Sequence, residues 1–129
     1  MSHFTRIRTR LTDGRVLREA LERMGHTVEP PGQGVVGYRG QRTDAEFKIC
    51  PRTGEHEIGF APSANGYVLV ADWWGIRSVG QKAFTRALNQ QYALVSAVST
   101  LEARGFRIDE QIQDETGQIR VVLRRHAGM

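Results

Sequence analysis

The amino-acid sequence predicts an α+β fold in which two helices lie on one face of a mostly antiparallel sheet. The main observation is a short unit that occurs twice, at residues 21–29 and 101–109. In each copy a helical pattern ends at a glycine, Gly25 or Gly105, and an alternating segment follows at once. Because glycine readily adopts the left-handed conformation that ends many helices, each copy is interpreted as a helix–strand unit. Short alternating segments between the two copies supply the remaining strands.

Alternation from His3 to Leu11 predicts the first strand, with apolar residues and threonines on one face and arginines on the other. Thr12 or Asp13 can cap the helix that follows. Apolar residues at helical spacing run from Val16 to Met24, and this helix is expected to stop at Gly25. A short second strand is predicted at 26–29, and Pro30-Pro31-Gly32 ends it.

The middle of the chain predicts a meander of short antiparallel strands, at 35–39, 45–50, 56–61 and 67–74. In the second of these, Ala45, Phe47 and Ile49 alternate with Glu46 and Lys48. Turns are expected near Gly40, at 51–54 and at 63–66. The last turn contains Asn65-Gly66, a strong signal for a hairpin between its two flanking strands.

The longest helical pattern runs from Gln81 to Arg104, and Gly105 is expected to end it. Alternating segments at 106–112 and 119–124 then predict two strands joined by a turn at 114–117, with Ile119, Val121 and Leu123 facing inward. We expect residues 125–129 to form a loose tail. Since no low-complexity segment or linker divides the chain, residues 1–129 are interpreted as a single domain.

Composition restricts the classes of function. A chain of 129 residues can bury a core without disulfides, and its only cysteine, Cys50, allows neither an internal disulfide nor a cysteine-rich metal cage. No apolar run approaches the length of a signal peptide or membrane span, so we expect a cytoplasmic protein without membrane contact. The net charge of +4 comes mostly from arginine, which permits a nucleic-acid partner without requiring one.

The sequence contains no pattern that predicts catalysis or a cofactor. Gly32, Gly34 and Gly37 match the dinucleotide-binding spacing, but no helical pattern follows them, so we interpret them as a turn. The four histidines are not at ligand spacings; a surface metal pair of His3 and His126 is an alternative to two exposed strand ends. Cys50 has no adjacent base. We therefore expect that the protein is not an enzyme and that it has no catalytic residues, no metal and no cofactor.

Two surfaces are candidates for binding. The first is Asp72-Trp73-Trp74-Gly75, because neighbouring side chains on a strand point to opposite faces and two tryptophans cannot easily share one core. One indole would then face a partner, since tryptophan is enriched at binding hot spots. The alternative is that both rings fill the core and Asp72 caps the next turn.

The second candidate surface is a set of arginines on the first and last strands. If both strands lie in one sheet, they form a basic platform that can take a single-stranded nucleic acid by stacking and phosphate contact. Its residues are Phe4, Arg6, Arg8, Arg10, Arg120 and Arg124. The alternative is a solvated face whose arginines pair with carboxylates such as Glu46 and Asp109, pairs that contribute little to stability.

The chain also carries a series of blocks in a specific order. They are Met1-Ser2-His3-Phe4, Tyr38-Arg39-Gly40-Gln41, Ile58-Gly59-Phe60, Tyr67 through Gly75, Gln91-Tyr92-Ala93, Gly105-Phe106 and Ile119 to Arg125. In these blocks, over essentially its full length, the chain resembles a domain-of-unknown-function family that includes a conserved hypothetical reading frame of plastid and cyanobacterial genomes. The resemblance implies no particular activity or cofactor. Bacterial relatives are thought to occur beside genes for AAA-type ATPases, which implies an adaptor or substrate role.

These observations lead to one hypothesis and one alternative. The hypothesis is a non-enzymatic, adaptor-like protein-interaction domain, working with a protein partner such as an AAA-type ATPase. Its contact residues are expected to be Tyr38, Arg39, Gln41, Asp72, Trp73 and Trp74. The alternative is a single-stranded nucleic-acid-binding domain that uses the arginine platform.

Overall fold

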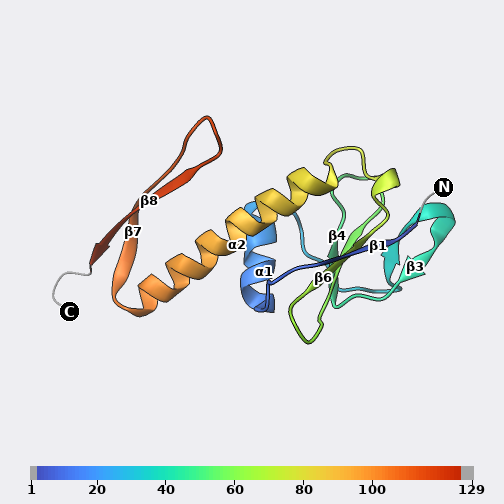
Figure 1. Cartoon of the computed structure of the whole chain (residues 1–129), viewed down its shortest axis with the longest axis horizontal. Helices are drawn as coiled ribbons and strands as arrows, with labels where there is room; N and C mark the ends of the chain where they lie inside the picture. Colours follow the sequence, from blue (N-terminus) through green and yellow to red (C-terminus); the bar gives the residue numbers. More distant parts are fainter. Residues whose placement is uncertain (1–2, 126–129) are drawn as a thin grey trace. The chain divides into compact units, whose positions relative to one another are not determined.

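A computed structural model describes residues 3–125, and within this range the chain forms two α-helices and eight strands in three antiparallel sheets (Figure 1). The predicted α+β class is therefore confirmed. The chain divides into two compact units, an N-terminal unit of residues 1–92 and a C-terminal unit of residues 93–129. The single domain stays a prediction, because a compact unit is not by itself an independently folding domain. No helix in the described range is long and apolar enough to cross a membrane.

Helix α1 spans Gly14–Arg23, and its two ends are fixed by short-range hydrogen bonds. Asp13 is the N-cap, because its Oδ1 accepts hydrogen bonds from the backbone N–H groups of Arg15 (3.0 Å) and Val16 (3.2 Å). At the other end, His26 N donates to Leu21 O over 3.1 Å and Gly25 N donates to Glu22 O over 2.9 Å. This is the Schellman pattern, and it requires the left-handed φ of 93° at Gly25. The predicted cap and stop are both confirmed.

The main sheet has four strands in the order β1 (Thr5–Arg8), β6 (Val68–Ala71), β5 (Ile58–Ala61) and β4 (Phe47–Ile49). The register places Ile7, Leu69, Phe60 and Phe47 in one row on one face. The Phe47 and Phe60 rings stack at 5.2 Å, and the Arg18 guanidinium of α1 lies 4.7 Å from the Phe47 ring centre. Helix α1 therefore lies on this face.

The opposite face of the main sheet carries a second, smaller sheet made of β2 (Val35–Val36) and β3 (Arg42–Thr43). Gly59 permits this packing, because a side chain there would overlap Val35. Lys48 lies on the same face and is only 9% exposed. Its Nζ donates to Gly34 O over 3.1 Å and to Glu57 Oε1 over 3.0 Å. The alternating sequence pattern predicts that Lys48 lies on the other face of the sheet from Phe47. It does not predict that β2 packs over this lysine.

All six strands predicted between residues 3 and 74 are shorter in the structure than the sequence pattern indicates, and the first three are the clearest cases. The first is β1, which covers only part of 3–11. The strand expected at 26–29 is reduced to an isolated bridge between Glu29 and Lys48, because the prolines at 30 and 31 have no N–H to extend the pairing. The strand expected at 35–39 ends at Val36, since a 3₁₀ turn, η1 (Tyr38–Gly40), follows.

The predicted hairpin around Asn65-Gly66 is confirmed, because β5 and β6 pair antiparallel across this turn. Ser63 and Gly66 exchange backbone hydrogen bonds of 3.1 and 3.4 Å, and Gly66 has a φ of 135°. A second 3₁₀ turn, η2 (Trp73–Gly75), follows β6. The strand predicted at 67–74 therefore ends at Ala71.

Helix α2 spans Gln81–Ala103 and ends one residue before the predicted limit, with Gly105 at a φ of 92°. Residues 81–92 belong to the N-terminal unit, where Phe84 packs against the rings of His26 and Trp73 at centroid distances of 5.9 Å each. The related unit at 21–29 has the same glycine stop but no full strand after it. The two copies are therefore alike only where their helices end, because a full strand follows the second copy and not the first.

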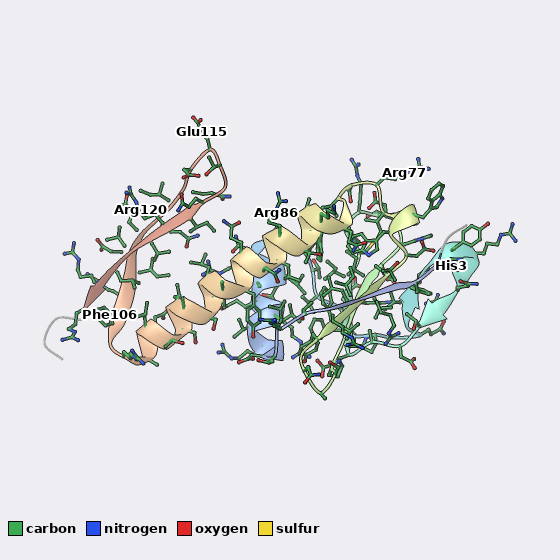
Figure 2. All side chains as sticks on the ribbon, viewed as in Figure 1. His3, Arg77, Arg86, Phe106, Glu115 and Arg120 are labelled. Atoms are coloured by element: carbon green, nitrogen blue, oxygen red, sulfur yellow. The ribbon has the colours of Figure 1, made fainter. Side chains whose placement is uncertain are left out.

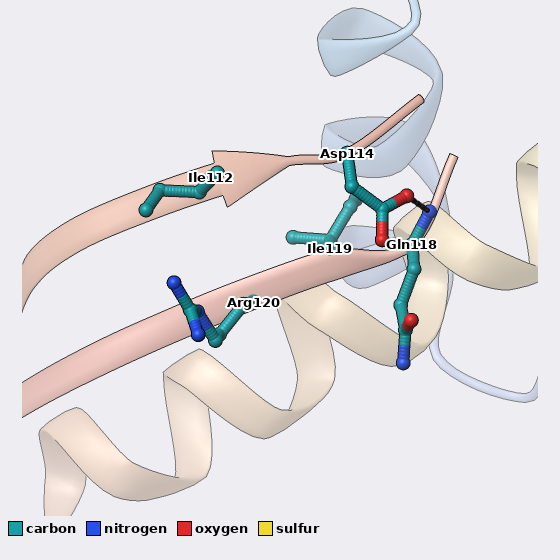
Figure 3. Close-up of a pocket in the computed structure, with 5 residues that line it drawn as sticks. All are labelled: Ile112, Asp114, Gln118, Ile119 and Arg120. Carbon is teal, nitrogen blue, oxygen red and sulfur yellow. Dashed lines mark hydrogen bonds between the residues drawn. The ribbon is translucent and has the colours of Figure 1, made fainter. Parts of the chain in front are cut away.

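The C-terminal unit contains a hairpin of β7 (Phe106–Gln113) and β8 (Ile119–Arg125). Along β8, Ile119, Val121 and Leu123 are half-buried and the residues between them are exposed, as the alternation predicts. Asp114 closes the turn by accepting from the N–H groups of Thr116 and Gln118 and from the Thr116 hydroxyl. Figure 3 shows the bond between Asp114 and Gln118. The Thr116 hydroxyl contributes most to lowering the pKa of Asp114.

Candidate functional site

The candidate site is a hollow of about 440 Å³ on the N-terminal unit, where η1, the loop after β4 and η2 meet. Two segments predicted separately from the sequence, around Tyr38 and around Trp74, line this same hollow. The lining is completed by Thr53, Gly54, Glu55, His56, Gly75 and Arg77. Figure 2 labels Arg77 at the surface of this unit, in the linker between η2 and α2.

The two tryptophans of η2 have different surroundings. Trp74 is 75% exposed, whereas Trp73 is half-buried with its ring 5.9 Å from that of Phe84. Consecutive side chains of a 3₁₀ turn diverge by about 120°, so one indole packs inward while the next faces solvent. The sequence predicts this divergence on the assumption of a strand, but the backbone here is a 3₁₀ turn. Of the two, Trp74 is the one available to a partner.

Asp72 joins the two segments that line the hollow. Its Oδ2 accepts the backbone N–H of Tyr38 over 3.1 Å, and its backbone carbonyl accepts from His56 Nδ1 over 3.2 Å. The His56 Nδ1 also lies 3.7 Å from Asp72 Oδ2. Asp72 is only 1% exposed, so its side chain supports the site from below the surface, and its contact with a partner stays a prediction. Its side chain makes no capping hydrogen bond to η2 either.

His56 forms the inner wall of the hollow beside Gly75. The backbone N–H of His56 donates to Gly75 O over 3.1 Å. A side chain at position 75 would overlap the His56 imidazole, so glycine is needed for this close approach. The ring of His56 is thus held from two sides, by Asp72 and by Gly75.

Glu55 lines the hollow, and its carboxylate accepts hydrogen bonds from the segment that follows η2. Its Oε1 accepts from Arg77 N (3.1 Å) and Ser78 N (2.8 Å), and its Oε2 accepts from the Ser78 hydroxyl (2.7 Å). The Ser78 hydroxyl is the largest cause of the lowered pKa of Glu55. These bonds fix the linker after η2 to the loop after β4.

Arg39 lies in an unusual backbone conformation at the tip of the β2–β3 hairpin. Its φ of 53° and ψ of 34°, the φ of 74° at Gly40 and the bond from Gln41 N to Tyr38 O (3.0 Å) define a type I′ turn. The Arg39 guanidinium lies 5.2 Å from the Tyr38 ring centre. Among the described residues, Arg39 and Arg77 make no ion pair within 4.0 Å. We call Tyr38, Arg39, Trp74 and Arg77 the aromatic-arginine surface.

Several side chains of this site are not evident from the sequence. Glu55 and His56 are distant in sequence from the predicted contact residues. Arg77 is only three residues after Trp74, but no local pattern marks any of the three. The sequence marks His56 as the first residue of a predicted strand and as a histidine without a ligand spacing. Gln41 is exposed on the turn beside Arg39, and it is not among the residues that line the hollow.

The arginines of the alternative platform lie in two different sheets. β1 carries Arg6 and Arg8 at the edge of the four-stranded sheet, with exposed Arg10 just beyond it, while Arg120 and Arg124 belong to the β7–β8 hairpin. The condition that both strands share one sheet is therefore not met. Phe4 is half-buried against Gly37, where a side chain at position 37 would overlap its ring.

The carboxylates named with the arginine face have separate partners. Asp109 pairs with Arg124 over 3.2 Å, as expected for a solvated face. Glu46 pairs with Arg18 of α1 over 3.7 Å and accepts from the Tyr67 hydroxyl over 2.5 Å. Burial and this bond to Glu46 raise the pKa of Tyr67 to about 12.

A second hollow, of about 490 Å³, lies at the turn of the β7–β8 hairpin and is lined by Ile112, Asp114, Gln118, Ile119 and Arg120 (Figure 3). The Asp114 carboxylate already accepts three hydrogen bonds from its own turn. No aromatic ring and no histidine line this hollow among the described residues. It therefore offers less binding chemistry than the hollow at Trp74.

Within residues 3–125, no cluster of three or more His, Cys, Asp or Glu side chains is placed to hold a metal ion. Burial raises the pKa of the Cys50 thiol, whose Sγ donates to Arg52 O over 3.1 Å. His126 lies outside the described residues, so the His3–His126 pair is not placed. Met1, Ser2 and the tail beyond Arg125 lie outside the described residues as well.

Comparisons with known proteins agree over nearly the full chain. A family model described as "Protein of unknown function (DUF1257)" matches residues 20–122. A protein called "Uncharacterized protein ycf35" from Guillardia theta is 33% identical over 128 residues, which cover 97% of this chain and 98% of the relative. Proteins with the same name from Pyropia yezoensis and Cyanophora paradoxa are 29% and 28% identical, with the same coverage of both chains. No solved structure matches.

Proposed function

The chain belongs to the DUF1257 family of proteins of unknown function, and from that premise we propose that it is a non-enzymatic protein-interaction domain. The proposed contact site is the aromatic-arginine surface. The proposal includes a cytoplasmic, reducing setting, which the single cysteine and the absence of a long apolar segment favour. It also includes an AAA-type ATPase as the first partner class to test, as the family resemblance implies.

The observation that carries the proposal is the position of Trp74. Its indole is 75% exposed, although the 3₁₀ turn beneath it is fixed by packed or hydrogen-bonded neighbours. Large aromatic side chains that are exposed on a rigid support are typical of binding hot spots, because little conformational entropy is lost when they are covered. Tyr38 of the same hollow adds a second aromatic ring.

The nucleic-acid alternative has weaker support. Single-stranded nucleic acids bind to grooves in which cations follow the backbone and aromatic rings stack on bases. The arginines named for that role are divided between two sheets, and Phe4 packs against Gly37. Nucleic acid is therefore kept as an outcome of the experiment and not as a second proposal.

The test is affinity capture of the tagged full chain from its source cells, followed by mass spectrometry. The wild type is compared with Trp74→Ala at about 0.15 M and about 0.5 M salt. We expect the substitution to reduce capture of the main protein partner by about tenfold or more, as is typical of a hot-spot tryptophan. Circular dichroism should show an unchanged fold, because Trp74 is mostly exposed.

A matched control is Val122→Ala, which truncates another exposed apolar side chain, in β8. Capture by this variant should equal that of the wild type. Equal capture by Trp74→Ala and the wild type would contradict the proposal. Recovery of nucleic acid that is lost at the higher salt concentration would support the alternative instead.

A further inference from the structure

We propose that the aromatic-arginine surface binds an acidic peptide segment of the partner protein. Carboxylates of the segment pair with Arg39 and Arg77, and an apolar or aromatic side chain of the segment enters the hollow beside Tyr38 and Trp74. This inference rests on the proposed function and names the chemistry of the partner.

Charge complementarity around the hollow is the first argument. Arg77 lines the hollow, whereas Arg39 lies beside it, with its guanidinium 5.2 Å from the ring centre of the lining residue Tyr38. Both arginines are exposed residues and make no ion pair among the described residues. Arg52 lies close enough to Glu55 to act on its carboxylate. Glu55 and Asp72 are the acidic groups nearby, and both already accept hydrogen bonds from the chain. Arg39, Arg52 and Arg77 supply three positive charges against these two negative ones, so one positive charge is in excess. The surface therefore attracts negative charge.

The shape and lining of the hollow are the second argument. A volume of about 440 Å³ lies in the range of small-ligand sites, so it accommodates a large side chain and its neighbours but not a whole secondary-structure element. Two aromatic rings, of Tyr38 and Trp74, and the imidazole of His56 form its walls. An apolar side chain flanked by carboxylates matches this combination of rings and cations.

The third argument is that the surface is already arranged for binding. Asp72 fixes the Tyr38 backbone and the His56 ring, and Glu55 fixes the segment that carries Arg77. Binding to such a preformed surface orders few groups and loses little entropy. Arg39 also occupies a left-handed position where asparagine or glycine is favoured. An arginine at this exposed tip therefore carries a backbone strain that asparagine or glycine would avoid, which favours a role for its side chain.

The experiment begins with a displayed library of random peptides, selected on the full chain and counter-selected on Trp74→Ala. One enriched peptide is then synthesised with a fluorescent label, and its Kd is measured by anisotropy. We expect enriched peptides to carry net negative charge and an aromatic or large apolar residue. The double variant R39Q/R77Q should weaken binding by about tenfold, since it removes two charge pairs at the site.

The control is R107Q/R120Q, which removes the same amount of positive charge from exposed positions of the β7–β8 hairpin. This variant should change Kd by less than about twofold, because the charges lie outside the proposed surface. A similar loss in both double variants would mean that net charge alone drives binding, and it would overturn the inference.

Three other outcomes would also overturn it: selection of neutral or basic peptides, failure to enrich any peptide, or tighter binding of a labelled oligouridine than of the peptide at the same residues. None of these three contradicts capture of a protein partner that depends on Trp74. The peptide experiment and the capture experiment can therefore fail separately, which distinguishes the inference from the proposed function.

Discussion

Asp72 has the largest role among single residues in assembling the candidate site. Its carboxylate holds the Tyr38 backbone and its carbonyl holds the His56 ring, although the side chain itself is buried. The sequence identifies Asp72 as part of an important segment, but it does not show that the residue acts from below the surface. Of the predicted contact residues, Arg39, Gln41 and Trp74 are exposed and Tyr38 is half-buried. Glu55 and His56 join them only through contacts between distant segments, which local patterns do not contain. Arg77 follows Trp74 by three residues, and its backbone N–H is held by Glu55.

Arg39→Asn is expected to stabilise the fold while it weakens binding. Asparagine tolerates the left-handed conformation at φ 53° better than arginine does, so the free energy of unfolding should rise by about 1 kcal/mol. Chemical denaturation measures this change. Arg42→Asn is the matched control, since Arg42 lies in the regular strand β3 and gains nothing from the substitution. A lower stability of Arg39→Asn would show that the turn is not strained.

Among the elements, the helices were easier to predict than the strands because their ends depend on neighbours in sequence. Asp13 caps α1 and Gly25 ends it through bonds that span only a few residues. The strand at 35–39, by contrast, is cut short by a turn with Arg39 at positive φ, a conformation that arginine does not predict. The burial of Lys48 depends on Gly34 and β2, which lie about 14 residues earlier in the chain, so the pattern around Lys48 does not predict it.

The contact of Lys48 with Gly34 and Glu57 joins the small sheet to the main sheet. Glu57 Oε1 accepts from Lys48 Nζ over 3.0 Å and also from the backbone N–H of Val36 over 2.9 Å. Lys48→Met should therefore lower the free energy of unfolding by about 3 kcal/mol, because it leaves the Glu57 carboxylate, whose side chain is only 14% exposed, without its cation. Chemical denaturation provides the measurement.

Lys82→Met is the control for this prediction, since Lys82 is exposed in the first turn of α2. It should change stability by less than about 0.5 kcal/mol. The double variant K48M/E57L should recover part of the loss, because it removes both charges together. A Lys48→Met protein as stable as the wild type would show that the pair does not join the sheets.

The whole molecule combines a four-stranded sheet with well-buried central strands and a β7–β8 hairpin that has no fully buried residue. Strands β5 and β6 consist almost entirely of buried residues, whereas no residue from Phe106 to Arg125 is fully buried. The N-terminal and C-terminal units both combine helix and antiparallel strands, in agreement with the predicted α+β class. The division at residue 92 was not predictable, because it falls inside the continuous helical pattern of α2.

Backbone amides of β7 and β8 are expected to exchange with solvent at least about tenfold faster than those of β5 and β6. A two-stranded hairpin with little buried area opens at a lower free energy than the central strands of a covered sheet. Hydrogen exchange measured by mass spectrometry on the full chain gives both rates. The matched comparison is within one sample, and equal protection of the two hairpins would contradict the prediction.

The opposite orientation of Trp73 and Trp74 gives the protein a built-in optical probe. With 75% of its surface exposed, Trp74 should emit at longer wavelength and be quenched by iodide, whereas Trp73, half-buried against Phe84, should emit at shorter wavelength and resist quenching. Any molecule that covers Trp74 would shift the emission and protect it from iodide. Occupancy of this face can thus be followed in the unlabelled protein, with Trp73 as an internal reference.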